Sequence, residues 1–172
     1  MFQRWLREGA ITALLACSMG TRAAPTDDHQ RGLQSYQRRD VVAAMSALRG
    51  AAKAGYAPSQ ALLAFILEGA DFRDEAVQLY GDAAAQGNAE GHAGLASLLP
   101  SGRGIAKDEN RALAHFSKAA ELGHAASIEV MVRVYQNGLF GATADPAATN
   151  EWRTRVVVLR KQPAGSAAKA PR

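Results

Sequence analysis

The chain has 172 residues, which suits one domain, and alanine and leucine dominate it while only 6% of its residues are aromatic. Alanine is the strongest helix former, so this composition favours an all-α protein. The single cysteine, Cys17, excludes an intramolecular disulfide framework and a cysteine-based zinc cluster. The net charge of +4 arises at the two ends, because residues 26–150 carry 11 Lys and Arg against 14 Asp and Glu. The body of the chain therefore lacks the basic face that nucleic-acid binding needs, and we expect no nucleic-acid partner.

The first residues have the features of a bacterial export signal. Arg4 and Arg7 give a positively charged start, an apolar run covers residues 10–16, and small residues follow. The apolar run is too short to cross a bilayer as a helix. We therefore predict an export signal over residues 1–24. The mature protein is then expected in the periplasm or at the outer membrane of a Gram-negative bacterium, or else it is secreted.

Two cleavage sites are open within this signal. The stretch from Leu14 to Cys17 resembles the lipobox of bacterial lipoproteins, which implies that Cys17 is lipidated and tethers the protein to the membrane. The alternative is ordinary cleavage after Ala23, which follows small residues. Both alternatives predict export, and only the first predicts a membrane tether.

The first helices follow the export signal. A helix is expected over residues 32–39, and Asp40 can cap the next one. From Asp40 to Ala52, apolar residues recur at helical spacing and form one stripe. Gly55 is expected to end this second helix, and Pro58 suits the first turn of a third.

Three short stretches divide the rest of the chain into similar units. Each contains two alanines followed by a glycine, at Gly55, Gly87 and Gly123, spaced by about 32 to 36 residues. A glycine can adopt the positive φ that ends a helix, and paired alanines let a neighbouring helix approach closely. We therefore expect positive φ at Gly87 and Gly123. Because the adjacent helices should pack tightly, a valine at Gly123 is also expected to collide with its neighbours.

The helices that follow these glycines share a packing pattern. At positions four, eight, nine and twelve after each glycine, small and large residues alternate along one side of the helix. These residues are Ser59, Leu63, Ala64 and Leu67, then Gly91, Leu95, Ala96 and Leu99, then Ser127, Met131, Val132 and Tyr135. The pattern predicts repeated helix packing and carries no chemistry of its own.

The stretch from Gly102 to Gly123 carries the most specific pattern. It reads Gly-x-Gly-Ile-x-x-Asp-x-x-Arg-Ala-x-x-His-Phe-x-Lys-Ala-Ala-Glu-Leu-Gly and resembles the Sel-one-like repeat (SLR), a relative of the tetratricopeptide repeat. The resemblance covers residues 28–160 as about four units. It implies an all-α solenoid of about four antiparallel helix pairs, which we assign to residues 26–160.

The other units depart from this pattern. The first lacks the early glycine loop, and the second has a shortened connection at 68–71. The last keeps Gly138 and Asp145 but loses the closing Ala-Ala-Gly stretch, as terminal repeats often do. After it, residues 161–172 are basic and contain two prolines and a glycine, so we predict a disordered tail.

Motifs for ligands and metals are weak. Residues 102–107 contain two glycines and a lysine, but a phosphate-binding loop needs a longer glycine spacing and a preceding strand. The four histidines show no i, i+4 pair of the kind that binds zinc on a helix. We therefore expect no cofactor and no metal. The histidines are His29, His92, His115 and His124, of which His115 stands at an aromatic packing position of the family.

Motifs for catalysis are also weak. No Gly-x-Ser-x-Gly elbow marks a nucleophile. Carboxylates such as Asp74, Glu75, Asp108 and Glu109 stand at expected helix starts, where they complement the helix dipole. We therefore expect a protein that is not an enzyme. Some proteins that resemble this family act as hydrolases on cell-wall or β-lactam substrates, so a hydrolase, or a regulator of one, stays the alternative.

Binding is expected on the concave face. Positions six, ten and thirteen after each hairpin glycine oppose the packing stripe, and in stacked helical repeats this row lines an elongated concave surface. The predicted function is therefore a non-catalytic interaction or scaffolding module of the cell envelope, a monomer that holds a protein or peptide partner. A secreted factor acting on a host protein is a second alternative. The row contains Ala61, Ala93 and Pro100 and the candidate binding residues Phe65, Glu68, Ser97, Glu129, Arg133 and Gln136.

Overall fold

A computed structural model describes residues 24–161, and these residues form eight α-helices and no strand. The predicted all-α class is therefore confirmed. Cys17, the export signal up to residue 23 and the tail from residue 162 lie outside the described residues, whereas Lys161, which we assigned to the tail, ends the last helix. The helices are α1 (Pro25–Gln37), α2 (Val41–Lys53), α3 (Ala57–Gly69), α4 (Arg73–Ala85), α5 (Ala89–Leu98), α6 (Glu109–Glu121), α7 (Ala125–Asn137) and α8 (Pro146–Lys161).

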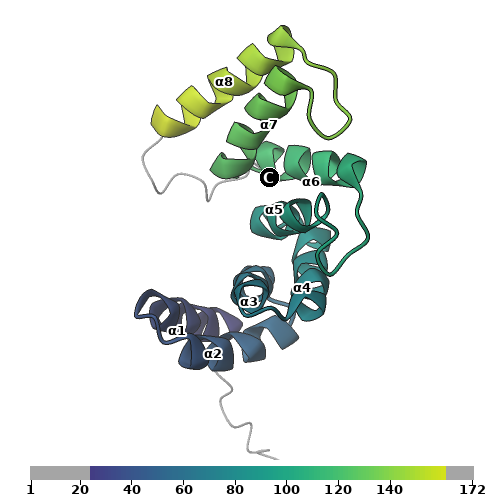
Figure 1. The fold of residues 1–172 in the computed structure, drawn as a ribbon. Coiled ribbons are helices and arrows are strands. Elements are labelled where there is room, and N and C mark those ends of the chain that lie inside the picture. The colour runs from purple at the N-terminus through teal and green to yellow at the C-terminus, as the bar shows by residue number, and fades with distance from the viewer. Residues whose placement is uncertain (1–23, 162–172) are drawn as a thin grey trace, which may run out of the picture.

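The helices pack as four consecutive pairs, α1–α2, α3–α4, α5–α6 and α7–α8, and each pair packs on the next (Figure 1). Helix α3 also contacts α5, the first helix of the next pair. In Figure 1, α3 and α5 lie nearer the open side of the curved array, and α4 and α6 form its outer wall. The predicted solenoid of four helix pairs is confirmed. No helix within residues 24–161 is long and apolar enough to cross a membrane.

The turns between helices follow the predicted chemistry. Asp40 caps α2, because its carboxylate accepts a hydrogen bond from the backbone nitrogen of Ala43 at 3.0 Å. Gly87 and Gly123 have φ of +75° and +89°, as expected. The expected collision at Gly123 is wrong, however, because no other atom lies within 4 Å of the place where a Cβ would be. The turn is open, and the tight packing lies one turn earlier, at the buried alanine pairs such as Ala119 and Ala120.

Helices α4 and α5 approach each other closely. A Cβ at Gly91 would lie 2.7 Å from the backbone nitrogen of Ala84, and a Cβ at Gly94 would lie 2.2 Å from the ring of Tyr80. Real side chains do not tolerate such distances, so α5 can lie this close to α4 only because both positions are glycine. Tyr80 can therefore extend from α4 beneath α5.

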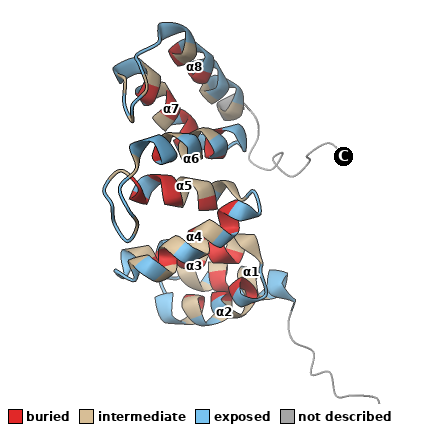
Figure 2. Ribbon diagram, turned by 90° about the vertical axis from the view of Figure 1, so that its right-hand side faces the viewer, coloured by how far each residue is buried: buried red, intermediate tan, exposed pale blue. Residues whose placement is uncertain are grey.

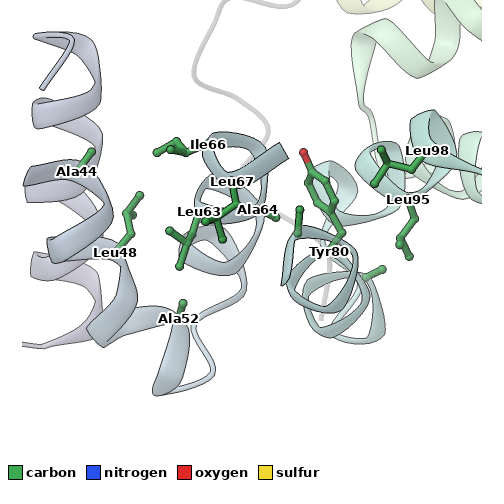
Figure 3. Packing of buried hydrophobic residues seen from close by; sticks show 12 residues of the cluster. Ala44, Leu48, Ala52, Leu63, Ala64, Ile66, Leu67, Tyr80, Leu95 and Leu98 are labelled. Carbon is green, nitrogen blue, oxygen red and sulfur yellow. The ribbon is translucent and has the colours of Figure 1, made fainter. Parts of the chain in front are cut away.

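The apolar residues form two separate cores, which we call the first and second cores. The first core joins α2, α3, α4 and α5, and Figure 3 shows Leu48, Leu63, Leu67 and Tyr80 at its centre. The second core contains Trp152, Met131, Ile128 and Ala120 from α6, α7 and α8. Figure 2 shows the buried residues where helices face one another and the exposed residues on turns and loops.

The connection between α5 and α6 is the long one, and it packs back onto the preceding pair. A Cβ at Gly104 would lie 2.7 Å from the Cβ of Arg73, at the start of α4. Ile105 packs against the first core. The glycine loop of the repeat is therefore a packing element, and no strand precedes it among the described residues.

The last pair ends the array. Gly138 ends α7 with φ of +65°, and the Asp145 carboxylate accepts hydrogen bonds from the backbone nitrogens of the first turn of α8. Val132 and Tyr135, which we placed on the buried stripe, are only half-buried. Both residues pack against the second core, and no further helix pair follows α8 in the described part of the chain.

Candidate binding groove

One hollow of the described structure, which we call the groove, has a volume of about 650 Å³. It crosses α1, α3 and α5 and ends at the first residue before α7. Most of its surface is apolar, and its polar residues include Glu68 near the end of α3 and Glu90 near the start of α5. The lining includes His29, Leu33 and Tyr36 from α1, Ala61, Leu62, Phe65 and Glu68 from α3, Glu90, Ala93, Gly94 and Ser97 from α5, Tyr80 from α4, and His124.

Two aromatic rings stand in the groove. Phe65 is 55% exposed, although it is a large apolar side chain in the middle of α3. Its ring lies edge-on to the ring of Tyr36, with centroids 6.2 Å apart and planes at 84°. An exposed aromatic ring that another ring holds in place is a typical anchor for a partner side chain.

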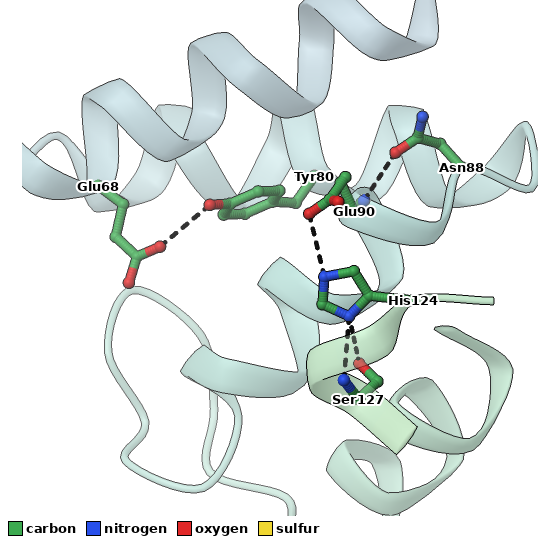
Figure 4. A network of polar contacts seen from close by, with 7 residues as sticks. Glu68, Tyr80, Asn88, Glu90, His124 and Ser127 are labelled. Carbon is green, nitrogen blue, oxygen red and sulfur yellow. Dashed lines mark hydrogen bonds and ion pairs between the residues drawn. The ribbon is translucent and has the colours of Figure 1, made fainter. Parts of the chain in front are cut away.

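A buried tyrosine reaches the groove from the outer wall. Tyr80 leaves α4, passes Gly94, and donates a hydrogen bond from its hydroxyl to the Glu68 carboxylate at 3.1 Å (Figure 4). Burial and the negative charge of Glu68 raise the pKa of Tyr80 far above its usual value. Tyr80 therefore stays protonated and keeps Glu68 oriented at this end of the groove.

A second polar group closes the other end. His124, the N-cap of α7, accepts hydrogen bonds at Nδ1 from the Ser127 backbone nitrogen at 3.2 Å and from the Ser127 hydroxyl at 2.7 Å. Its Nε2 lies 3.2 Å from the Glu90 carboxylate (Figure 4). This network fixes the tautomer, because an accepting Nδ1 leaves the proton on Nε2, which donates to Glu90. The same hydrogen bond lowers the pKa of Glu90.

Ser127, His124 and Glu90 are the residue types of a hydrolase triad, and sequence reasoning missed this convergence. The geometry is that of a helix cap. Ser127 is 1% exposed and stands on the packing face of α7, so a substrate carbonyl could not reach its hydroxyl. The histidine also bonds the serine through Nδ1, whereas a triad uses Nε2 for the nucleophile. His29 and Ser59 repeat this contact at 3.0 Å, and Ser59 is 0% exposed.

Two further histidines meet between α5 and α6. The Nδ1 atoms of His92 and His115 lie 2.9 Å apart, although the residues are far apart in sequence. Burial lowers the pKa of both, and the nearby cations of Lys118 and Arg111 add to this effect. His115 thus pairs with a histidine where we expected simple aromatic packing. Within residues 24–161, no three His, Cys, Asp or Glu side chains form a group that could hold a metal ion.

The structure brings three of the predicted binding residues together and separates the others. Phe65, Glu68 and Ser97 all line the groove. Ala61 also lines it but is only 4% exposed, and Pro100 lies beyond the end of α5.

The other three predicted residues lie on the last pair. Glu129 and Arg133 line a separate hollow between α7 and α8, which we call the C-terminal hollow. Gln136 lies in another hollow, where it accepts a hydrogen bond from Arg153 at 3.4 Å. The expected continuous row is therefore divided among three hollows.

Solved structures of other proteins share this fold. A Sel1 repeat protein from Oxalobacter formigenes matches with a TM-score of 0.70 and 23% identity, over 80% of this chain and 58% of that protein. A protective antigen present in uropathogenic Escherichia coli strains, described as displaying an SLR fold, matches with a TM-score of 0.69 and 24% identity, over 78% of this chain and 30% of that protein. This chain therefore spans less than two thirds of either protein. No protein-family model and no curated protein matches the sequence.

Proposed function

From this SLR fold, a helical repeat scaffold that suits protein interaction, we propose that the chain is a non-catalytic module that holds a segment of a protein partner in the groove. The observation that carries the proposal is the 55% exposure of Phe65 in the groove, against Tyr36 and above an apolar floor. In soluble proteins, a concave apolar surface with an aromatic anchor is a typical binding site.

The groove suits a chain segment. Its lining comes from helices of three successive pairs and from the cap of the fourth, so the surface is elongated across the repeats. A helix or an extended peptide can place side chains at intervals along such a surface. Binding energy in such interfaces concentrates on a few buried side chains, and aromatic residues are prominent among them. Phe65 is the strongest candidate for this role.

The proposal is tested by photo-crosslinking in cells that produce the protein. Phe65 is replaced by p-benzoylphenylalanine, and the matched control carries the same residue in place of Lys118, which is exposed on the outer helix α6. We expect a defined covalent adduct from position 65 and none from position 118. Phe65→Ala should then weaken binding of the captured partner by about 2 kcal/mol or more, with helicity unchanged. Adducts from position 118 alone, or none from position 65, would contradict groove binding.

We also propose that the module works outside the cytoplasm, in the periplasm or at the outer membrane. The support is the sequence of residues 1–24, with its basic start, short apolar run and small residues. Mass spectrometry of the mature N-terminus tests this proposal. A lipidated Cys17 would establish the membrane tether, a peptide that begins at Ala24 would establish export without it, and an intact N-terminus at Met1 would contradict both.

A further inference from the structure

The charge of the groove restricts the partner that it can hold. Its lining contains two carboxylates, Glu68 and Glu90, and neither a lysine nor an arginine. The two carboxylates differ in what they contact. Glu90 already bonds to the imidazole of His124, whereas Glu68 accepts a hydrogen bond from the neutral hydroxyl of Tyr80.

Other glutamates of the described chain show that an intramolecular partner of opposite charge is common in this fold. Glu75, Glu109, Glu121 and Glu151 form ion pairs with Arg49, Lys107, Lys118 and Arg155. These pairs lie on exposed surfaces, where a carboxylate needs a partner least. Glu68 is half-buried beside the apolar floor, and no cation among residues 24–161 forms an ion pair with it. A carboxylate that is partly removed from water gains most from an added cation.

Glu68 also lies close to Phe65 on α3. The two residues are three apart on α3, so their side chains leave the same face of the helix about 5–6 Å from each other. A ligand that contacts the ring of Phe65 is therefore within reach of the carboxylate. A cation held there would also lie near the aromatic pair of Phe65 and Tyr36, which favours it further.

We propose that the groove recognises a peptide segment in which a lysine or arginine lies close to a large apolar residue. The apolar side chain packs against Phe65 and Tyr36, and the cation binds the carboxylate of Glu68. Tyr80 occupies one oxygen of that carboxylate and leaves the other for the partner. This inference rests on the proposed function and specifies the chemistry of its partner.

The test begins with selection of a random 12-residue peptide library, displayed on phage, against the purified chain. We expect the recovered peptides to share a large apolar residue with a lysine or arginine within four positions. Selection against Glu68→Gln should recover peptides that keep the apolar residue and lose the basic one. Glutamine still accepts the Tyr80 hydrogen bond, so this variant removes the charge without removing the contact.

Binding of a fluorescently labelled peptide from this selection then measures how much the charge of Glu68 contributes. We expect about tenfold weaker binding when its arginine is replaced by the neutral isostere citrulline, and a similar loss with Glu68→Gln. Combining the two changes should give little further loss, because both remove the same interaction. Tyr80→Phe keeps the charge and should keep the preference for arginine. Glu121→Gln, an exposed position on α6, is the matched control and should bind like the wild type.

The outcomes distinguish the two proposals. If no peptide is enriched, or if the enriched peptides bind Phe65→Ala as tightly as the wild type, the groove does not bind segments and the proposed function fails. Peptides that depend on Phe65 but carry no basic residue would overturn only the inference about the cation. The same holds if Glu68→Gln and wild type select the same basic residue, or if Tyr80→Phe loses binding as strongly as Glu68→Gln.

Discussion

The two cores, one among α2 to α5 and the other among α6 to α8, differ in how their side chains fill the space between helices. In the first core, alanines at the helix crossings and glycines such as Gly91 and Gly94 bring the backbones together, so one apolar cluster extends from α2 to α5. In the second core, large side chains such as Trp152 and Met131 make most of the packing among α6, α7 and α8. Small residues therefore allow the first core to extend through four helices, whereas the second core depends on a few large side chains.

The same difference separates the two candidate surfaces. The groove crosses α1, α3 and α5, has an apolar floor, and contains two carboxylates but no lysine or arginine. The C-terminal hollow lies between α7 and α8 and contains Arg133, Arg153 and Glu129. A ligand that suits one of these surfaces does not suit the other, so a single uniform binding row is not what this repeat array offers.

The largest loss of stability that would distinguish the two cores is expected from Trp152→Ala. Trp152 is 8% exposed in the second core, so its loss should destabilise the last pair by about 3–5 kcal/mol. Hydrogen exchange followed by mass spectrometry should show lost protection in α7 and α8, with α2 to α5 nearly unchanged. Equal loss of protection in α3 would instead mean that the two cores unfold as one unit.

A smaller effect is expected from valine at the glycines of the two regions. Gly91→Val places a side chain against the backbone of α4, which cannot move aside, and should cost about 3 kcal/mol. The Cβ of Gly123→Val has open space around it, so the main cost should be the strain of its positive φ, about 1–2 kcal/mol. Thermal melting of both variants checks the order. If Gly123→Val were the more damaging of the two, close packing would not be what distinguishes the first region.

The smallest effect concerns the junction between the regions, where His92 on α5 meets His115 on α6. Burial lowers the pKa of both below the ordinary value of 6.5, so the unfolded chain binds protons more readily than the folded one just below that pH. Stability is therefore full above about pH 6.5 and falls as the pH decreases below it. The melting temperature should fall by a few degrees, roughly, between pH 7.5 and 5.5. The double variant His92→Gln, His115→Gln should show a flatter profile, and an equally steep one would assign the effect to other groups.

Much of the fold is predictable because its signals are local. The Asp40 cap, the hairpin glycines and the alanine pairs each act within one turn of a helix, so spacing along the chain reveals them. The family pattern of residues 102–123 then indicates how the pairs stack. The free space around a residue depends on where other helices lie, which spacing along the chain does not reveal. For this reason the expected collision at Gly123 was wrong.

The groove was only partly predictable for the same reason. Phe65, Glu68 and Ser97 could be found because they stand at fixed distances after a hairpin glycine. Tyr36 was missed, because α1 follows no such glycine, and Tyr80 was missed, because it reaches the groove from the outer wall. Gly94, a glycine inside a helix, was the available signal that another side chain passes close by.

The stacking of consecutive pairs also bears on how the chain folds. Most contacts between helices join neighbours in the chain, and the main exception is the contact of α3 with α5, so the contact order is low. The loop around Gly104 and Ile105 packs onto residues that precede it in the chain. Because the chain is synthesised from its N-terminus, each new helix pair finds the preceding pair, on which it packs, already made. Assembly can follow the order of synthesis, and the last pair, with its own core, is the last to join.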